Sequence, residues 1–209
     1  MTKQLAFYFD ASACTGCKAC VVACKDRSNL PVGVNWRRVY HYEGGEWGTD
    51  PNNKDLMVPK NLFVTATSVA CMHCQVPVCA NVCPTGAITK DDNGIVTINQ
   101  DQCIGCRYCQ WACPYGAPQF NDEAGVMTKC DFCQDLQAEG QNPACVDACV
   151  MRVLDYGELG ELRVKHGSEA AVEPLPPADI TYPSVVITPH KDSQASGKGT
   201  GKILTLEEV

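Results

Sequence analysis

The sequence predicts an α+β fold, in which short helices and β-hairpins surround two nested cysteine-rich units and an extended tail follows. Three observations support this expectation. The 16 cysteines of the 209-residue chain fall into four groups of four. Short runs of strand-forming residues alternate with Gly-rich turns. Beyond residue 172 the composition changes to Pro, Gly and Ser, which is typical of an extended segment.

The composition limits the class of protein. A chain of 22.6 kDa with 45% hydrophobic residues can bury a sizeable core, so its cysteines are not needed as disulfide staples. The formal charge of -7 and the pI near 5.0 argue against a nucleic-acid partner. We therefore expect the cysteines to bind metal.

The cysteines form four quartets that vary one pattern, Cys-x2-Cys-xn-Cys-x3-Cys, with n equal to 2, 4, 2 and 11 in turn. They are Cys14, Cys17, Cys20 and Cys24; Cys71, Cys74, Cys79 and Cys83; Cys103, Cys106, Cys109 and Cys113; and Cys130, Cys133, Cys145 and Cys149. The third quartet, followed by Pro114, matches the ferredoxin run C-x2-C-x2-C-x3-C-P at every position. Because that run binds iron-sulfur clusters, the pattern predicts one [4Fe-4S] cluster per quartet.

The chemistry of the cluster accounts for the spacing. A [4Fe-4S] cube has four iron corners, and each corner takes one thiolate. Three cysteines on a short loop reach one cube, whereas the fourth ligates the neighbouring cluster in two-cluster ferredoxins. Zinc needs only two Cys-x2-Cys pairs per ion, and disulfides fit such closely spaced cysteines poorly. A zinc-binding interaction module is the distant alternative.

A hairpin is expected to join the second and third quartets. Strand-forming residues at 88–89 and 95–98 flank an Asn93-Gly94 turn, which predicts a hairpin that brings these quartets together. With the last cysteines exchanged, this inner ferredoxin-like unit, at about residues 71–118, holds two clusters. Cluster 3 then has the ligands Cys71, Cys74, Cys79 and Cys113, and cluster 4 has Cys83, Cys103, Cys106 and Cys109.

The first and fourth quartets flank the inner unit and are expected to form an outer ferredoxin-like unit, from about residues 5–30 and 128–157. The same exchange gives cluster 1 the ligands Cys14, Cys17, Cys20 and Cys149, and cluster 2 the ligands Cys24, Cys130, Cys133 and Cys145. Lys25 and Val150 stand where the inner quartets have proline.

The connecting segments extend this four-cluster domain, which is expected to span residues 1–157. Apolar runs at 36–42 and 62–67 are predicted strands of a small sheet within an insertion at 31–70. A further hairpin is expected at 119–128, just before the fourth quartet.

Residues 158–209 are expected to form a short helix and then a tail. The helix is predicted from Glu158 to His166, closed by Gly167, and a strand is predicted at 182–188. The tail has too little apolar sequence for a core of its own, so it is expected to lie extended along the domain or along a partner subunit.

Several side chains near the quartets could affect a cluster. Lys18, Lys25, Arg107, Lys129 and Arg152 could raise a cluster potential, although a solvated surface position is the simpler expectation for each of them. The aromatic residues Tyr108, Trp111 and Tyr115 are expected to pack rather than to relay electrons.

The chain lacks the motifs of an enzyme that acts alone. The sequence has no Cys-x3-Cys-x2-Cys loop for radical chemistry, no Ser-His-Asp or HExxH arrangement, no P-loop and no GxGxxG. Four complete quartets cap every iron with a thiolate, which predicts redox stations for electron transport and no catalytic residue.

Neither a signal peptide nor a membrane span is expected. The N-terminal apolar run is only five residues long. The stretch 61–89 lacks charged residues, but its four cysteines, Pro77 and Pro84 argue against a span. Any export is therefore expected to depend on the signal of a partner.

The quartets and their surroundings resemble the four-cluster iron-sulfur subunits of molybdopterin oxidoreductases. Within that family they are most similar to the electron-transfer B subunits of anaerobic dimethyl sulfoxide reductases. The resemblance rests on residues 14–18, 103–109, 112–119 and 127–131, and it extends to 161–167 and 171–176 in the tail, so that it covers nearly the whole chain.

The resemblance implies a heterotrimer that serves anaerobic respiration. In it the chain would pass electrons from a menaquinol-oxidising membrane anchor to a molybdopterin catalytic subunit. It would lie peripherally at the cytoplasmic membrane, touching it only through the anchor, on the periplasmic face after co-export with the catalytic subunit. Some relatives replace one cysteine of the third quartet, but Cys106 is present here, so four [4Fe-4S] clusters are expected. The equivalent subunit of a thiosulfate, polysulfide or tetrathionate reductase or of a formate dehydrogenase is the alternative.

Overall fold

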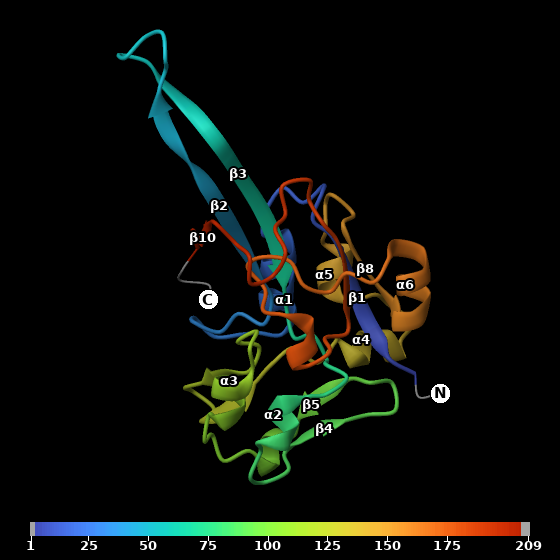
Figure 1. Cartoon of the computed structure of the whole chain (residues 1–209). Helices are drawn as coiled ribbons and strands as arrows, with labels where there is room; N and C mark the ends of the chain where they lie inside the picture. The colour runs from blue at the N-terminus through green and yellow to red at the C-terminus, as the bar shows by residue number, and fades with distance from the viewer. Residues whose placement is uncertain (1–2, 206–209) are drawn as a thin grey trace.

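A computed structural model describes residues 3–205 of the chain (Figure 1). Within this range the chain has two three-stranded sheets, two small hairpins and several short helices. The structure is therefore a mixed α+β fold of short helices and small sheets, as expected. In the same range, no helix combines the length and the apolar character that crossing a bilayer requires.

The first sheet holds the centre of the core. Its middle strand β1 (Leu5–Asp10) pairs antiparallel with β8 (Leu154–Glu158) and parallel with β9 (Val185–Thr188). Ala6 and Val186 pack beneath helix α6 (Leu159–His166), and the opposite face carries the main core. The Glu158 carboxylate caps α6 by accepting a hydrogen bond from the Glu161 N–H at 3.0 Å. The helix and its end at Gly167 confirm the sequence prediction.

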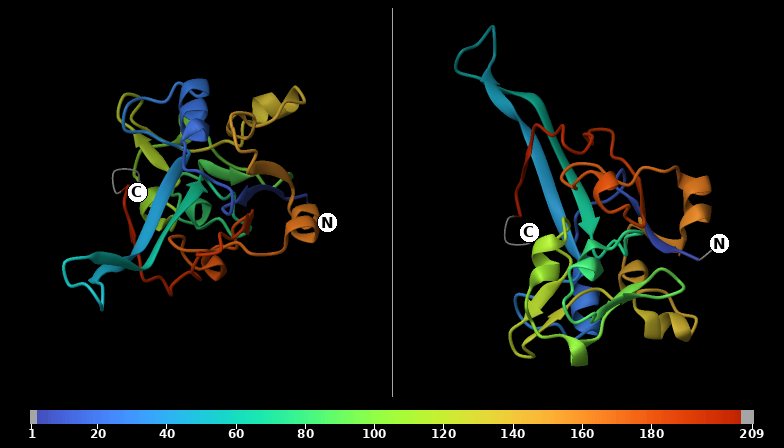
Figure 2. Two further views of the ribbon diagram at one scale, coloured as in Figure 1. Left: turned by 90° about the horizontal axis from the view of Figure 1, so that it is seen from above. Right: turned by 60° about the horizontal axis from the view of Figure 1, so that its bottom comes forward.

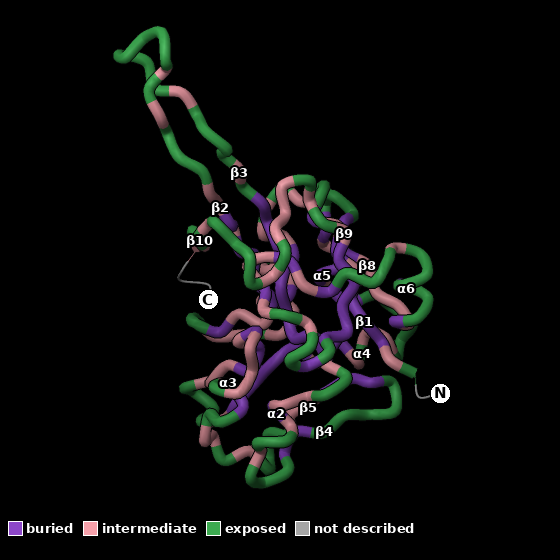
Figure 3. Tube along the Cα trace, viewed as in Figure 1, coloured by how far each residue is buried: buried purple, intermediate pink, exposed green. Residues whose placement is uncertain are grey.

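The second sheet is a long hairpin that stands out from the rest of the molecule (Figures 1 and 2). Its strands are β2 (Arg38–Thr49) and β3 (Met57–Val69), and β10 (Lys202–Ile203) adds to β2. The base of the hairpin is buried and its outer half is exposed (Figure 3). The strands expected at 36–42 and 62–67 are confirmed, and the hairpin is longer than expected because a β-bulge between Gly44 and Glu46 keeps the ladder continuous.

Two short hairpins follow the second and third quartets, as predicted. β4 (Ile88–Lys90) pairs with β5 (Val96–Ile98), and β6 (Gln119–Asn121) pairs with β7 (Val126–Thr128). In the first turn the Asp91 carboxylate accepts hydrogen bonds from the N–H groups of Asn93 and Ile95, and Gly94 has a φ of 80°. These hairpins fold the inner quartets back toward each other.

The remaining helices are short, and most of them carry cysteines. They are α1 (Ala19–Arg27), α2 (Val78–Asn81), α3 (Tyr108–Ala112), α4 (Gln134–Ala138) and α5 (Ala144–Asp147), with 3-10 turns η1 (Gln100–Gln102) and η2 (Ala178–Ile180). The third cysteine of each quartet lies on α1, α2, α3 or α5. Helix α1 packs against α5, and α2 packs against α3. The first quartet thus meets the fourth, and the second meets the third.

The C-terminal segment lies along the domain, which is one of its two expected arrangements. Strand β9 completes the central sheet, and Leu175 is buried in the core. The backbone N–H groups of Gln75 and Val76 donate to the carbonyls of Tyr182 and Thr181, which ties the tail to the second quartet. The tail is therefore part of the packed structure up to residue 205.

We expect Ile187→Ala to destabilise the whole protein. Ile187 on β9 is 1% exposed, and deleting its buried methyl groups should cost about 2–5 kcal/mol of unfolding free energy. The thermal midpoint of the anaerobically purified protein should fall by about 4 °C or more. Val164→Ala is the control, because Val164 is 90% exposed on α6 and should change the midpoint by less than about 1 °C. Equal midpoints for both variants would contradict the packing of the tail.

Candidate iron-sulfur centres

All four quartets begin with the same turn. The residue that directly precedes the second cysteine has a left-handed backbone conformation in each of them, with φ of 68° at Gly16, 41° at His73, 69° at Gly105 and 64° at Phe132. Glycine adopts this conformation freely, whereas His73 and Phe132 adopt it at a steric cost of roughly 1–2 kcal/mol each. Both of these side chains are fully buried, with their rings edge to face at 5.1 Å, and this packing maintains the turn.

Three cavities are each lined by four cysteines. The cavities have similar empty volumes of about 320, 340 and 290 Å³, part of it open to solvent. They are lined by set 1 (Cys14, Cys17, Cys20, Cys149), set 3 (Cys71, Cys74, Cys79, Cys113) and set 4 (Cys83, Cys103, Cys106, Cys109). In each cavity three cysteines belong to one quartet, and the fourth is the last cysteine of another quartet.

The remaining cysteines, Cys24, Cys130, Cys133 and Cys145, form set 2. Burial raises the pKa of Cys24 to about 12, Arg37 opposes this rise, and Cys145 and Cys133 add to it. Burial also raises the pKa of Cys130, and the nearby Cys24, Cys71 and Cys145 raise it further. Helix α1, which carries Cys24, packs on α5, which carries Cys145, so Cys24 of the first quartet lies beside the cysteines of the fourth.

The sets lie next to one another in numerical order. Sets 1 and 2 share α1, which carries Cys20 and Cys24. Sets 2 and 3 meet at Lys129, whose Nζ lies 3.4 Å from the Cys71 Sγ and donates to the Cys130 carbonyl at 3.0 Å. Sets 3 and 4 share the α2–α3 pair, because Cys79 lies on α2 and Cys109 on α3.

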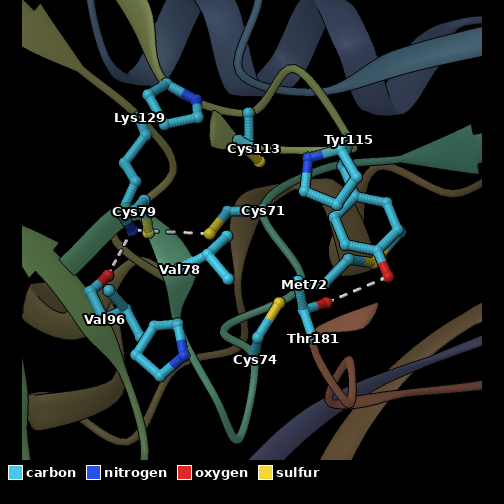
Figure 4. Close-up of a pocket in the computed structure, with 14 residues that line it drawn as sticks. Cys71, Met72, Cys74, Val78, Cys79, Val96, Cys113, Tyr115, Lys129 and Thr181 are labelled. Atoms are coloured by element: carbon cyan, nitrogen blue, oxygen red, sulfur yellow. Dashed lines mark hydrogen bonds between the residues drawn. The ribbon is translucent and has the colours of Figure 1, made fainter. Parts of the chain in front are cut away.

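The cavity of set 3 shows the arrangement in detail (Figure 4). The labelled cysteine side chains surround one space, and Lys129 reaches in from the side. Burial raises the pKa of Cys74 and of Cys79 to about 12, so as free thiols both would be neutral at pH 7. A hydrogen bond from the Thr181 side chain, on the tail, opposes the rise at Cys74.

The donors fit an iron-sulfur cluster. Soft thiolates select iron-sulfur clusters, Zn or Cu(I), and a bound metal stabilises the thiolate that burial disfavours. Hydrogen-bond donors also reach the sulfurs, and these are the backbone N–H groups of Met127 to Cys103 (3.4 Å), Phe132 to Cys130 (3.4 Å) and Val153 to Cys149 (3.3 Å). Each such donor favours the ionised form of the sulfur that it contacts.

The five basic residues near the quartets do not share one environment. Arg107 and Arg152 are exposed, as expected, and Lys18 and Lys25 are half-buried. Lys129 is buried, so the expectation of a surface cation is wrong for this residue. Its Nζ lies 3.4 Å from the Cys71 Sγ and donates to the carbonyl of Val96 (Figure 4). It also donates to the carbonyl of Cys130.

The aromatic residues of the third quartet also differ. Tyr115 is buried beside set 3, with its hydroxyl 3.2 Å from the Thr181 Oγ1, which confirms a packing role. Trp111 is 74% exposed and Tyr108 is 52% exposed; their rings pack against each other with centroids 5.8 Å apart, but neither residue belongs to the buried core.

Two buried arginines were not expected from the sequence. Arg37 and Arg38 lie at the start of the long hairpin and are 3% and 2% exposed. The Arg37 Nη1 donates to the Ser68 Oγ at 3.0 Å, and the Arg38 Nη2 donates to the Tyr115 carbonyl at 2.6 Å. Neither arginine is near a cysteine in the sequence, and a Trp-Arg-Arg run inside a predicted strand does not indicate that both arginine side chains are buried.

Comparisons with known proteins agree with this geometry. Residues 62–159 match the family model of a 4Fe-4S dicluster domain, and residues 5–26 match that of a 4Fe-4S binding domain. The chain is 49% identical to the B subunit of the anaerobic dimethyl sulfoxide reductase of Escherichia coli (strain K12) over 209 residues, which is 100% of both proteins. It is 47% identical to the corresponding B subunit of Haemophilus influenzae, over 99% of this chain and 100% of that one.

A more distant relative is the thiosulfate reductase electron transfer subunit PhsB of Salmonella typhi. It is 38% identical over 166 residues, which cover 79% of this chain and 81% of the relative. The similarity to the dimethyl sulfoxide reductase subunits is higher and runs from end to end, which confirms the resemblance found in the motifs. The chain is therefore a member of the family of B subunits of anaerobic dimethyl sulfoxide reductases, the iron-sulfur electron-transfer subunits of this type of molybdoenzyme.

Proposed function

We propose that the chain holds four [4Fe-4S] clusters and relays electrons from a menaquinol-oxidising membrane anchor to a molybdopterin catalytic subunit. One observation carries this proposal. Each cysteine-lined cavity combines three cysteines of one quartet with the last cysteine of another, as the exchange of ligands in two-cluster ferredoxins requires. When bound, a [4Fe-4S] cluster accepts and releases single electrons.

The proposed ligands are the four sets. Sets 1 and 2 hold clusters 1 and 2 in an outer ferredoxin-like unit, from about residues 5–30 and 128–157. Sets 3 and 4 hold clusters 3 and 4 in an inner unit at about residues 71–118, nested within the outer one. The packing of α1 on α5 and of α2 on α3 supports this division.

The order of the sets supports a relay. Neighbouring sets share a helix, a helix pair or the contacts of Lys129, so electrons can pass along the row from set 1 to set 4 or in reverse. The chain is not catalytic alone in this proposal, because all 16 thiols are taken up as ligands.

The complex is proposed to be a heterotrimer at the cytoplasmic membrane, on its periplasmic face. End-to-end similarity favours dimethyl sulfoxide as the terminal acceptor. The weaker similarity to a thiosulfate reductase subunit leaves a sulfur-oxyanion substrate as the second candidate. The third cysteine of each quartet disfavours a zinc module, because a zinc ion bound by two Cys-x2-Cys pairs already has its four ligands.

We expect the protein purified without oxygen to hold about 16 iron and 16 sulfide per chain, and Cys106→Ser to lower iron to between about 12 and 15. Only one cluster should change, because Cys106 lines only the cavity of set 4. Metal analysis measures the iron content, and the EPR spectrum of the reduced protein shows how many clusters change. Trp111→Ala, between Cys109 and Cys113 and 74% exposed, should keep the full iron content. Zinc without sulfide, or the loss of two clusters, would contradict the proposal.

The exchange of the last cysteines can be tested separately. We expect Cys113→Ser and Cys79→Ser to alter the same EPR signal, because both residues line the cavity of set 3. Cys109→Ser should alter a different signal, although Cys109 belongs to the same quartet as Cys113 in the sequence. If Cys113→Ser and Cys109→Ser change one common signal, each quartet keeps its own fourth cysteine and the exchange is wrong.

The partners can be tested by anaerobic affinity purification of the tagged full chain from detergent-solubilised membranes. We expect one molybdenum-containing subunit and one integral membrane protein in amounts equal to the chain, and neither from cells with the untagged chain. The substrate of the captured molybdoenzyme then decides between dimethyl sulfoxide and thiosulfate. Recovery of the chain alone, with its iron content intact, would refute the proposed heterotrimer.

A further inference from the structure

Arg37 is a buried cation without a carboxylate partner. The residue is 3% exposed, and within residues 3–205 no Asp or Glu forms an ion pair with it. Its guanidinium lies over the Phe7 ring, 4.7 Å from the centroid, and its Nη1 donates to the Ser68 Oγ at 3.0 Å. An arginine is always protonated in a protein, so this site carries a fixed positive charge.

One donor of this guanidinium has no acceptor. The Arg37 Nη2 is buried and has no hydrogen-bond partner in the part of the chain that the structure describes. A buried, unpaired N–H of a charged group is costly, and such a group calls for an acceptor of negative charge. The protein atoms around Arg37 do not supply that acceptor.

The groups that face Arg37 belong to sets 1 and 2. The Ser68 Oγ, which accepts from Arg37, lies 3.5 Å from the Cys20 Sγ of set 1. Burial lowers the pKa of Arg37, but Cys145, Cys20, Cys130 and Cys24 raise it more, so its pKa ends above the ordinary value. Three of these four cysteines belong to set 2 and one to set 1.

The surroundings of Arg37 also lead to both sets. Helix α1 carries Cys20 of set 1 and Cys24 of set 2, about one helical turn apart. The Phe7 ring beneath Arg37 stacks on Phe132, which lies between Cys130 and Cys133 of set 2, with ring centroids 4.2 Å apart. Arg37 therefore lies close enough to both outer sets to stabilise negative charge on either of them.

We propose that Arg37 is a positioning residue whose buried positive charge raises the reduction potentials of the two outer clusters, mainly that of set 2. This inference rests on the proposed function. Reduction adds one electron to a cluster, and a nearby fixed cation stabilises the reduced form. Arg37 would also reduce the repulsion between the two clusters when both are reduced.

Arg38 provides a matched control. It neighbours Arg37 and is buried to the same degree, but the cysteine that it acts on is Cys113 of set 3. Its Nη2 already donates to the Tyr115 carbonyl. Substitution of Arg38 should therefore leave the outer clusters at their normal potentials.

The test is an anaerobic redox titration of the full chain followed by EPR. Signals of sets 1 and 2 are first identified with Cys17→Ser and Cys133→Ser. In Arg37→Gln, the ratio of reduced to oxidised set 2 cluster at a fixed potential should fall about tenfold, a shift of about 59 mV for one electron. The set 1 cluster should shift less, and Arg37→Lys should recover part of both shifts. Arg38→Gln should shift neither.

Each outcome of the redox titration either supports or overturns the proposal. Unchanged outer potentials in an Arg37→Gln protein that keeps its full iron content would overturn the proposal. If Arg37→Gln does not assemble, Arg37→Lys decides by the presence or absence of a shift confined to sets 1 and 2. Loss of iron from sets 1 and 2 in both variants would mark Arg37 as a structural residue and would also overturn it. Failure of the proposed function is distinct, because the unmodified chain would then lack four clusters.

Discussion

Each cysteine set includes one thiol from another quartet, and the fold depends on bringing these separate segments together. Set 1 combines three cysteines of the first quartet with Cys149, and set 2 combines three cysteines of the fourth quartet with Cys24. Both ends of the cysteine-rich region must therefore meet, which places α1 against α5 and β1 beside β8. The inner quartets lie between these ends in the sequence and fold as a separate pair. The nesting of the two pairs follows from the packing of α1 on α5 and of α2 on α3.

The local parts of this structure were predictable, and so was one distant contact, that of the first quartet with the fourth, but the other distant contacts were not. The quartets, the hairpins at 88–98 and 119–128 and the helix α6 depend on residues close together in sequence, so spacing, turn residues and caps reveal them. Strand β9 pairs with a strand that starts about 180 residues earlier, and no local pattern specifies that partner. The buried position of Lys129 was also missed, because lysine side chains are almost never fully buried in proteins unless they are paired.

The tail is important to the fold although its composition does not allow it a core of its own. Its Pro-rich and Gly-rich sequence cannot form a core by itself, as its composition predicts. It nevertheless contributes Ile187 to the main core and Thr181 to the lining of set 3. Segments without an autonomous core can still be essential, because they bury their few apolar residues against a core that other segments have built.

Two of the buried basic groups, Arg37 and Lys129, lie at the junctions between cysteine sets. Arg37 faces sets 1 and 2, and the Nζ of Lys129 lies between Cys71 of set 3 and the carbonyl of Cys130 in set 2. In the proposed cluster-bound protein, four thiolates around each cluster would add negative charge, and this charge would repel that of the neighbouring set in a medium of low dielectric constant. A positive charge at the junction stabilises the negative charge of both adjacent sets, whereas a positive charge at the far side of a set would stabilise that set alone. Placing Arg37 and Lys129 between the sets therefore lets adjacent sets lie close together, which a row of redox sites requires.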